Sequence, residues 1–280
     1  MTLNFILRDK ILAKIKDKQF ERYTKLIYDK LGIHITEAKR EMIQSKVSKL
    51  MRALEIDCFD QYYDFLLSNN KNGHWSQFVD EITIHKTNFF REDNHFEFIR
   101  NKLDSIFKNN PRILKNNEIR VWSSACSNGK EAYTLAIVLK EYLPSYMNIK
   151  ILATDVSAGI IEKAQKATYA LDPEDMINPY FLGKYFNKVG SEYEVVQELK
   201  NLITFRSFNL MDSFPFKNTF DIIFCRNVMI YFNFETQEDL IKKFYNVLPV
   251  GGLLFIGHSE SLNQKQYKFE YIQPTVYMRS

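Results

Sequence analysis

The feature that most constrains the fold is a series of short apolar segments after residue 115 that alternate with helix-forming stretches. The apolar segments are "EIRVWSSA", "IKILATDVS", "LITFRSFNL", "FDIIFCRN" and "GGLLFIGH", and the helix-forming stretches include "GKEAYTLAIVLKEYL", "AGIIEKAQKATY" and "TQEDLIKKFYNVL". Strands that are apolar throughout and alternate with helices are typical of a parallel sheet covered on both faces. We therefore predict an α/β domain with a mostly parallel sheet.

Residues 1–75 have a different pattern, with apolar residues at helical spacing. The expected buried positions are Phe20, Tyr23, Ile27 and Leu31 in a first helix, which Gly32 would end, and Met42, Val47, Leu50 and Leu54 in a second. Residues 169–202 are irregular, contain strand-like "YEVV", and are too many for a simple connection. We predict a helical domain over 1–76, a linker over 77–95, and an α/β domain over 96–280 that carries a small β-subdomain at about 170–202.

Composition excludes several classes of protein. The three cysteines, Cys58, Cys126 and Cys225, are far apart and form no C-x-x-C pair, and the five histidines form no H-E-x-x-H. We therefore expect a reducing compartment and no metal site. Charges from Arg8 onward interrupt the apolar start, and no run of 18 apolar residues follows. These features predict a soluble, cytoplasmic protein without membrane insertion.

The charge is unevenly distributed along the chain. Residues 1–52 hold 13 Lys and Arg against 6 Asp and Glu, a net charge of +7, so the remaining residues sum to −3. One interpretation is a solvated helical face. The other is a docking surface for an acidic partner.

Polar residues follow each of the predicted strands, at the edge where open α/β sheets bind their ligands. They are Ser127, Asn128, Gly129, Glu131, Asp155, Asn209, Arg226, Asn227 and, one turn later, Tyr231. Helix capping could explain any one of them. It explains poorly an arginine, Arg226, that directly follows an apolar strand and has no evident partner.

Asp155 indicates a nucleoside site. It lies 26 residues after Gly129, and a carboxylate at that position accepts hydrogen bonds from ribose hydroxyls. The first turn lacks G-x-G-x-x-G, so it is not suited to a pyrophosphate, and S-adenosylmethionine fits. "NPY" at 178–180 lies in the irregular insert rather than after a strand, and the α/β domain has no strongly basic stripe, so we expect no nucleic-acid substrate.

Taken together, these segments resemble the CheR-type family of chemotaxis receptor glutamate methyltransferases over nearly the whole chain. The resemblance is carried by "TNFFRE", "VWSSACSNGKEAYTLAI", "ILATDVS", "FDIIFCRNVMIYF" and "GGLLFIGHSESL". It implies an S-adenosylmethionine-dependent, Rossmann-like methyltransferase domain with a small β-subdomain, preceded by an all-helical domain. The activity implied is esterification of glutamate side chains on the cytoplasmic helices of chemoreceptors.

The resemblance also implies roles for particular residues. Phe89 and Phe90 would pack into an interdomain seam, and Arg91 would face both the cofactor and the incoming glutamate, with an interdomain salt bridge as its alternative role. The cofactor contacts implied are His85, Thr87, Arg91, Glu131, Asp155, Asn209, Leu210, Arg226 and Asn227. Tyr231 would lie near the methyl group. His85 stands where the family commonly has Asn, and Lys130 and Ala132 replace the acid and the proline of its usual "GEEPY".

The chemistry implied needs no general base, because a glutamate carboxylate is ionised at neutral pH, with a reference pKa of about 4.3. Arg91 would orient that carboxylate, and Tyr231 would donate a hydrogen bond beside the methyl group. The cysteines would be small buried residues rather than nucleophiles. Docking on the receptor would use the basic amino-terminal helices of a monomer. The short loop around Gly190 argues against binding of a receptor tail pentapeptide.

Two alternatives stay open. One is a catalytically silent adaptor that binds S-adenosylmethionine, for which His85 and Lys130 are the support. The other is a small-molecule carboxyl methyltransferase, against which the basic amino-terminal helices argue.

Overall fold

The computed structural model describes residues 14–68, 73–216, 219–262 and 268–280. The chain divides into two compact units, Met1–Ile84 and His85–Ser280, so the division falls inside the segment expected as a linker. The charged start around Arg8 lies outside the described residues. Within the described residues, no helix combines the length and apolar character needed to cross a bilayer.

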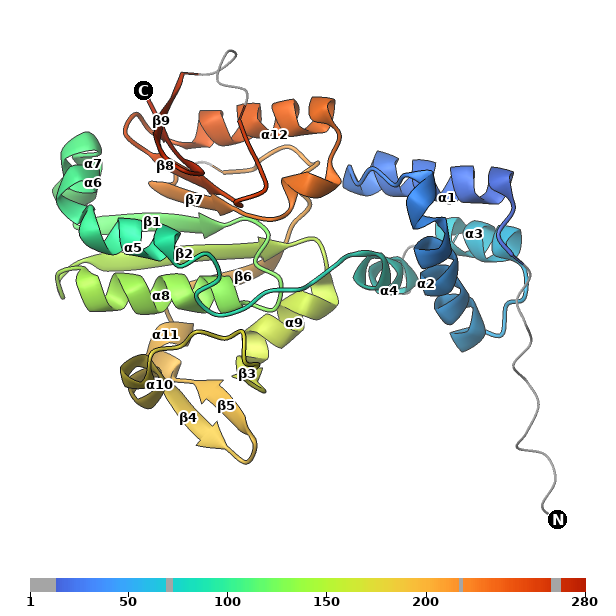
Figure 1. The fold of residues 1–280 in the computed structure, drawn as a ribbon, viewed down its shortest axis with the longest axis horizontal. Coiled ribbons are helices and arrows are strands. Elements are labelled where there is room, and N and C mark those ends of the chain that lie inside the picture. The colour runs from blue at the N-terminus through green and yellow to red at the C-terminus, as the bar shows by residue number, and fades with distance from the viewer. Residues whose placement is uncertain (1–13, 69–72, 217–218, 263–267) are drawn as a thin grey trace. The chain divides into compact units, whose positions relative to one another are not determined.

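The first unit is helical, as the spacing predicted (Figure 1). Its elements are α1 (Asp17–Leu31), η1 (Glu37–Lys39), α2 (Arg40–Ala53), α3 (Phe59–Ser68) and α4 (His74–Ile82). The four apolar positions expected on α1 are all buried. Gly32 ends α1 with a φ of 71°, the left-handed conformation that glycine adopts without strain, which confirms the predicted stop.

The buried face of α2 differs from the expected one. Ile43, Val47 and Met51 are fully buried, and the small Ser48 lies beside them. Of the four residues predicted, only Val47 belongs to this face, whereas Met42, Leu50 and Leu54 are half-buried. The predicted apolar face began at Met42, one residue before the first buried residue, Ile43. Successive residues of an α-helix are about 100° apart around its axis, so the predicted face was rotated away from the core.

The second unit contains the predicted sheet, with seven strands in the order β6-β2-β1-β7-β8-β10-β9. The strands are β1 (Glu118–Ser123), β2 (Asn148–Asp155), β6 (Ile203–Ser207), β7 (Ile222–Cys225), β8 (Leu253–Ile256), β9 (Phe269–Gln273) and β10 (Val276–Arg279). The first five named are parallel and the last two antiparallel. All five strands expected from the apolar segments are therefore confirmed.

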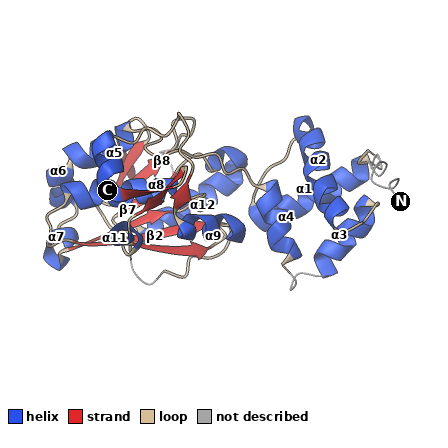
Figure 2. Ribbon diagram, turned by 90° about the horizontal axis from the view of Figure 1, so that it is seen from below, coloured by secondary structure: helices blue, strands red, loops and turns tan. Residues whose placement is uncertain are grey.

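Helices cover the sheet on both faces (Figure 2). The helices of this unit outside the insert are α5 (Asn94–Asn101), α6 (Leu103–Asn109), α7 (Arg112–Asn116), α8 (Lys130–Tyr142), α9 (Ala158–Lys166) and α12 (Phe234–Val247), of which α6 and α7 lie at one end of the sheet (Figure 1). Adjacent residues of β1 show the two faces. Trp122 packs edge-on against Phe244 of α12, whereas Ser123 bonds Glu131 of α8.

The expected insert is a small antiparallel sheet in the order β3-β5-β4, which confirms the predicted β-subdomain. Its elements are β3 (Thr168–Tyr169), α10 (Pro179–Tyr185), β4 (Phe186–Val189), β5 (Glu192–Val195) and α11 (Gln197–Lys200). A turn of two residues joins β4 to β5.

The two phenylalanines of "TNFFRE" belong to the core of the second unit, and this corrects the expectation that they fill an interdomain seam. The Phe89 ring lies edge-on to Tyr169 and Phe186, at centroid distances of 5.1 and 5.3 Å. The Phe90 ring stacks on Phe181 at 5.8 Å. The rings therefore hold the segment before α5 against the insert.

Candidate functional site

The ends of β1, β2 and β7 lie side by side, because these strands are neighbours in the sheet. Asp155 ends β2, and its side chain is almost fully buried. Its Oδ2 accepts a hydrogen bond from Ser127 N at 2.9 Å, and its Oδ1 accepts one from Ser157 N at 3.1 Å. Burial raises the pKa of Asp155, and the Ser157 bond and the nearby His85 imidazole lower it in part. Val156 contributes a further backbone hydrogen bond, and because a carboxylate has about four acceptor positions, one is left for a hydroxyl group.

Arg226, which follows β7, is paired rather than unpaired. Its Nη1 lies 3.2 Å from Glu131 Oε2, and its Nη2 lies 3.1 Å from Glu92 Oε2. Nη2 also donates to the carbonyl oxygen of Arg91. The Arg226 side chain is only 2% exposed, so one guanidinium joins the start of α8 to the segment before α5. These two ion pairs explain how an arginine can be buried directly after an apolar strand.

Glu92 is a residue that the sequence analysis missed. It adopts a φ of 57°, and its carboxylate accepts N–H groups from Arg226, Asn227 Nδ2 and the backbone of His258. Burial raises the pKa of Glu92, but Arg226 and the other donors outweigh it, so the pKa lies below its usual value. The three residues that donate to its carboxylate are more than 130 positions away in sequence, and only its place in "TNFFRE" could have drawn attention to it.

Hydrogen bonds connect the segment before α5, residues 85–93, to the rest of the second unit at several points along its length. Ser127 Oγ donates to the carbonyl oxygen of His85 at 2.9 Å, and Phe90 N donates to Thr134 Oγ1 at 3.2 Å. Thr87 lies between these anchors and is half-buried. Arg91 Nη1 donates to the Lys86 carbonyl oxygen at 3.0 Å. The predicted site residues of this segment therefore lie on a fixed strip of backbone.

Tyr231 lies at the end of a short helix, η2 (Met229–Tyr231), after β7. Burial raises the pKa of its phenol, the Arg91 guanidinium lowers it, and Glu260 raises it. The net shift is upward, so the phenol is a hydrogen-bond donor at neutral pH. The two predicted catalytic side chains are therefore linked electrostatically, since the charge of Arg91 opposes the upward shift of the Tyr231 pKa.

Asn209 and Leu210 follow β6, the neighbour of β2. Asn209 Oδ1 accepts a bond from Met211 N at 3.0 Å, which turns the chain. Leu210 is buried, and its carbonyl oxygen accepts a bond from Lys243 of α12 at 3.0 Å. A buried leucine beside a turn presents an apolar surface of the kind that a base requires.

Lys130 points away from the strand ends, toward the insert. Its Nζ lies 2.7 Å from Asp175 Oδ2, and the side chains of both residues are at most 4% exposed. Asp175 also accepts a bond from Phe89 N at 2.8 Å. The replacement of an acid by Lys130 therefore builds a buried ion pair, while Glu131 keeps its place beside Arg226.

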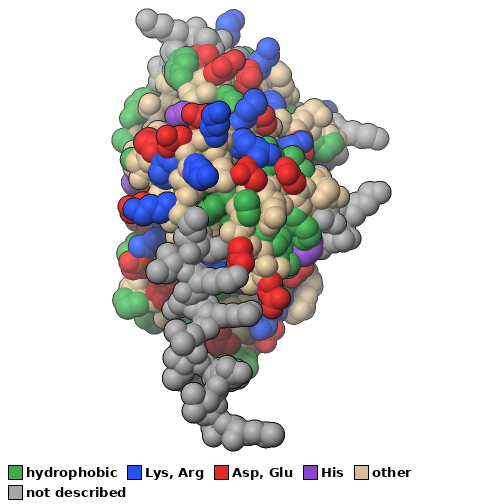
Figure 3. Space-filling model, turned by 90° about the vertical axis from the view of Figure 1, so that its right-hand side faces the viewer, with side chains coloured by type: hydrophobic (Ala, Val, Ile, Leu, Met, Phe, Trp, Pro, Cys, Tyr) green, Lys and Arg blue, Asp and Glu red, His purple; other side chains and the backbone are tan. Residues whose placement is uncertain are grey.

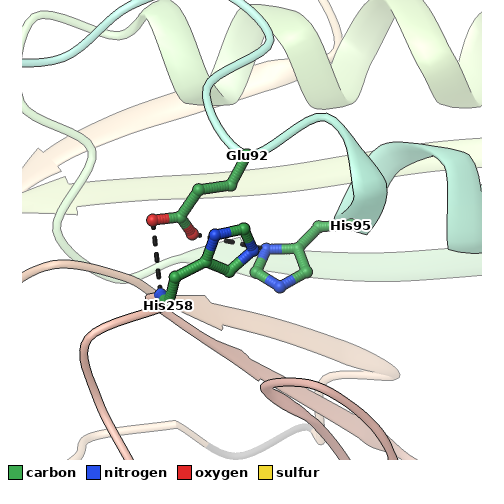
Figure 4. A group of neighbouring side chains, drawn as sticks. All are labelled: Glu92, His95 and His258. Atoms are coloured by element: carbon green, nitrogen blue, oxygen red, sulfur yellow. Dashed lines mark hydrogen bonds and ion pairs between the residues drawn. The ribbon is translucent and has the colours of Figure 1, made fainter.

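Three potential metal ligands also meet here, namely Glu92, His95 and His258 (Figure 4). His95 Nδ1 lies 3.7 Å from Glu92 Oε2, and His258 Nε2 lies 2.9 Å from Asn94 Oδ1. However, the two oxygens of Glu92 already accept N–H groups from three residues, one of them the Arg226 guanidinium. A divalent cation would have to displace a buried cation from that carboxylate. We therefore interpret the group as part of the hydrogen-bonded network.

The basic amino-terminal helices are less free than their charge suggested. Lys46 Nζ donates to the carbonyl oxygens of Glu81, Ile82 and Thr83, at 2.5, 3.3 and 3.3 Å, and so caps the end of α4. Lys49 pairs with Glu81 at 2.7 Å. Residues 53–84 carry a net charge of −5. On the face shown in Figure 3, Lys and Arg side chains lie among Asp and Glu side chains.

Comparison with known proteins gives a consistent result. The family model described as "CheR methyltransferase, SAM binding domain" matches residues 85–278, and "CheR methyltransferase, all-alpha domain" matches residues 18–83. A "Chemotaxis protein methyltransferase" of Borreliella burgdorferi is 37% identical over 95% of this chain and 95% of the relative. Relatives with the same name are 35% identical in Salmonella typhimurium and 34% in Escherichia coli, over 95% of this chain and 91% and 92% of the relative.

Proposed function

This chain belongs to the CheR methyltransferase family, and from that membership we propose that it methylates glutamate side chains of chemoreceptors to form methyl esters. The observation that carries the proposal is the meeting of two groups at one sheet edge: the buried carboxylate of Asp155 and the network around Arg226, which also binds the Arg91 carbonyl oxygen. The relatives named "Chemotaxis protein methyltransferase" support methyl transfer in chemotaxis.

The residues present fit S-adenosylmethionine. The Asp155 carboxylate suits ribose hydroxyls, and buried Leu210 with Asn209 suits the adenine side. His85, Thr87, Glu131, Arg91, Arg226 and Asn227 complete the proposed cofactor contacts. When bound, S-adenosylmethionine supplies a methyl group that is electrophilic because it is attached to a sulfonium. Because the Arg226 guanidinium already binds Glu92, Glu131 and the Arg91 carbonyl oxygen, we assign its side chain to holding that edge in place.

The protein's task is to hold an ionised carboxylate in line with that methyl group. Of the three nitrogens of the Arg91 guanidinium, Nη1 alone has a hydrogen-bond partner among the residues that the structure describes. Nε and Nη2 are therefore available to a carboxylate. The Tyr231 phenol donates a hydrogen bond beside the reacting atoms. No residue has to remove a proton, since the acceptor is ionised at neutral pH.

The proposed partner is the cytoplasmic helical region of a chemoreceptor, which would recruit the enzyme from the cytoplasm to receptor arrays. Docking would use the cations of α1 and α2 that remain exposed, among them Arg52, on a monomeric enzyme. The two-residue β4–β5 turn contains Gly190 as its single glycine, so the insert should not bind a receptor tail pentapeptide tightly. Titration with tail pentapeptides from the host's receptors tests this, and a micromolar dissociation constant would contradict it.

The reaction is tested by transfer of labelled methyl from S-adenosylmethionine to receptor-enriched membranes, measured as base-labile ester. Arg91→Ala should lower turnover far more than cofactor affinity, whereas Arg100→Ala, which removes an exposed arginine paired with Glu97, should leave both unchanged. Absence of ester in the parent would exclude the proposed activity and favour a silent adaptor. Normal turnover in Arg91→Ala at saturating receptor would leave Arg91 a structural residue.

A further inference from the structure

Glu260 lies in the loop after β8, and its carboxylate accepts hydrogen bonds from three backbone N–H groups of the loop after β7 and from one in its own loop. Its Oε2 accepts from Gly257 N at 2.5 Å and from Asn227 N at 3.1 Å. Its Oε1 accepts from Met229 N at 2.8 Å and from Ile230 N at 3.3 Å. The carboxylate is almost fully buried. Hydrogen bonds from N–H groups to a carboxylate are among the stronger ones in proteins.

These bonds satisfy the start of η2, the turn that ends at Tyr231. The first N–H groups of a helical turn have no partner within the turn, and a negative charge at that end is favourable. Residues next to a helix usually provide such a cap. Here the cap is Glu260, about 30 residues further along the chain, so the position of the turn depends on the neighbouring strand, β8.

The close approach of the two loops depends on a glycine. A Cβ atom at Gly257 would lie 2.6 Å from Asn227 Nδ2, 2.8 Å from Asn227 N and 2.9 Å from Glu260 Oε2. Asn227 itself adopts a φ of 57°. This left-handed conformation, which asparagine adopts more readily than most residues, turns the chain where the two loops meet.

We propose that Glu260 is a positioning residue for methyl transfer, which fixes the turn that carries Tyr231 at the end of β7. Its carboxylate acts through Tyr231 and does not touch the reacting atoms. The alternative is a general structural role, in which Glu260 stabilises the sheet edge without a particular effect on Tyr231. This inference rests on the proposed function.

A double-mutant cycle separates the two roles. Glu260→Gln is isosteric but leaves one oxygen to accept from four donors, so kcat should fall at least about tenfold while the affinity for S-adenosylmethionine changes less than about threefold. In a Tyr231→Phe background the same substitution should change kcat by less than about twofold. Glu270→Gln, on the exposed side of β9, is the matched control and should behave like the parent.

Equal losses in both backgrounds, or a Glu260→Gln enzyme within about twofold of the parent, would overturn the positioning role. If Glu260→Gln does not fold, Glu260→Asp, which keeps the charge on a shorter side chain, replaces it in the same cycle with the same expected and contrary results. A parent that transfers no methyl group would overturn the proposed function and this inference with it, whereas an active parent with an active Glu260→Gln overturns this inference alone.

Discussion

Replacing His95 by glutamine should remove an acid-dependent loss of stability from the second unit. The imidazole is fully buried on α5, edge-on to Phe224 and Phe255, and its Nε2 lies 2.7 Å from Thr275 Oγ1. Glu92, His258 and Arg226 face it. Burial lowers the pKa of His95 to about 3, and the positive charge of Arg226 contributes to the shift.

The sign of the effect follows from the depressed pKa. Below pH 6.5 the unfolded chain protonates His95, whereas the folded chain keeps it neutral down to about pH 3, so the unfolding free energy decreases as the pH falls. The loss is about 1.4 kcal/mol for each pH unit, or about 2 kcal/mol between pH 7.5 and pH 5.0. Glu131, Asp155 and Glu260 have raised pKa values and give the opposite slope. The prediction therefore concerns the difference between parent and variant.

Urea unfolding measures that difference. In a Trp75→Phe background the remaining tryptophan, Trp122, is fully buried in the sheet, so its fluorescence reports the second unit. The free-energy difference between parent and His95→Gln should shift by about 2 kcal/mol in favour of the variant from pH 7.5 to pH 5.0. His34→Gln, at an exposed histidine of the first unit, should show no such shift. A difference that stays constant with pH would refute the reasoning.

Three further predictions concern cofactor, fold and partner. Asp155→Ala should weaken binding of S-adenosylmethionine by roughly ten- to a hundredfold, and unchanged affinity in calorimetry would place the cofactor elsewhere. Lys130→Met leaves a buried carboxylate unpaired and should lower the unfolding free energy by about 3–5 kcal/mol; adding Asp175→Asn should recover much of this loss in urea unfolding, and strictly additive losses would contradict the pairing. Charge reversal at Lys49 and Arg52, three residues apart on α2, should raise the Michaelis constant for receptor, an effect that salt should reduce, and parent-like kinetics would place docking elsewhere.

The strands, their order along the chain and the polar residues at their ends could be predicted from the sequence, because burial on both faces of a sheet makes strands apolar throughout. The α2 face was missed by one residue, since its apolar residues fit two overlapping helical faces. Partners far apart in sequence could not be predicted at all. Glu92 and Arg226 are 134 positions apart, and no local pattern marks either residue as half of a pair.

The same limit applies to individual charges. Lys46 has the sequence appearance of a solvated cation, yet it caps α4 because folding brings that helix end within reach of its amine. From the sequence, Lys130 was support for a catalytically silent adaptor, whereas in the structure it forms a buried pair with Asp175. A charge can be counted from sequence, but whether it faces solvent depends on the tertiary contacts of its helix.

The contacts of Asp175 have a consequence for recombination and for protein engineering. This one side chain, in the insert between β3 and α10, binds Lys130 on α8 and the backbone of Phe89 ahead of α5. The β-subdomain is therefore not an interchangeable cassette, although its sheet is separate from the main one. A chimera that keeps Lys130 but takes 170–202 from a relative without an acid at position 175 would leave a buried cation where a buried ion pair now forms. Viable crossovers must transfer Lys130 and Asp175 together, so these two positions should be inherited as a unit.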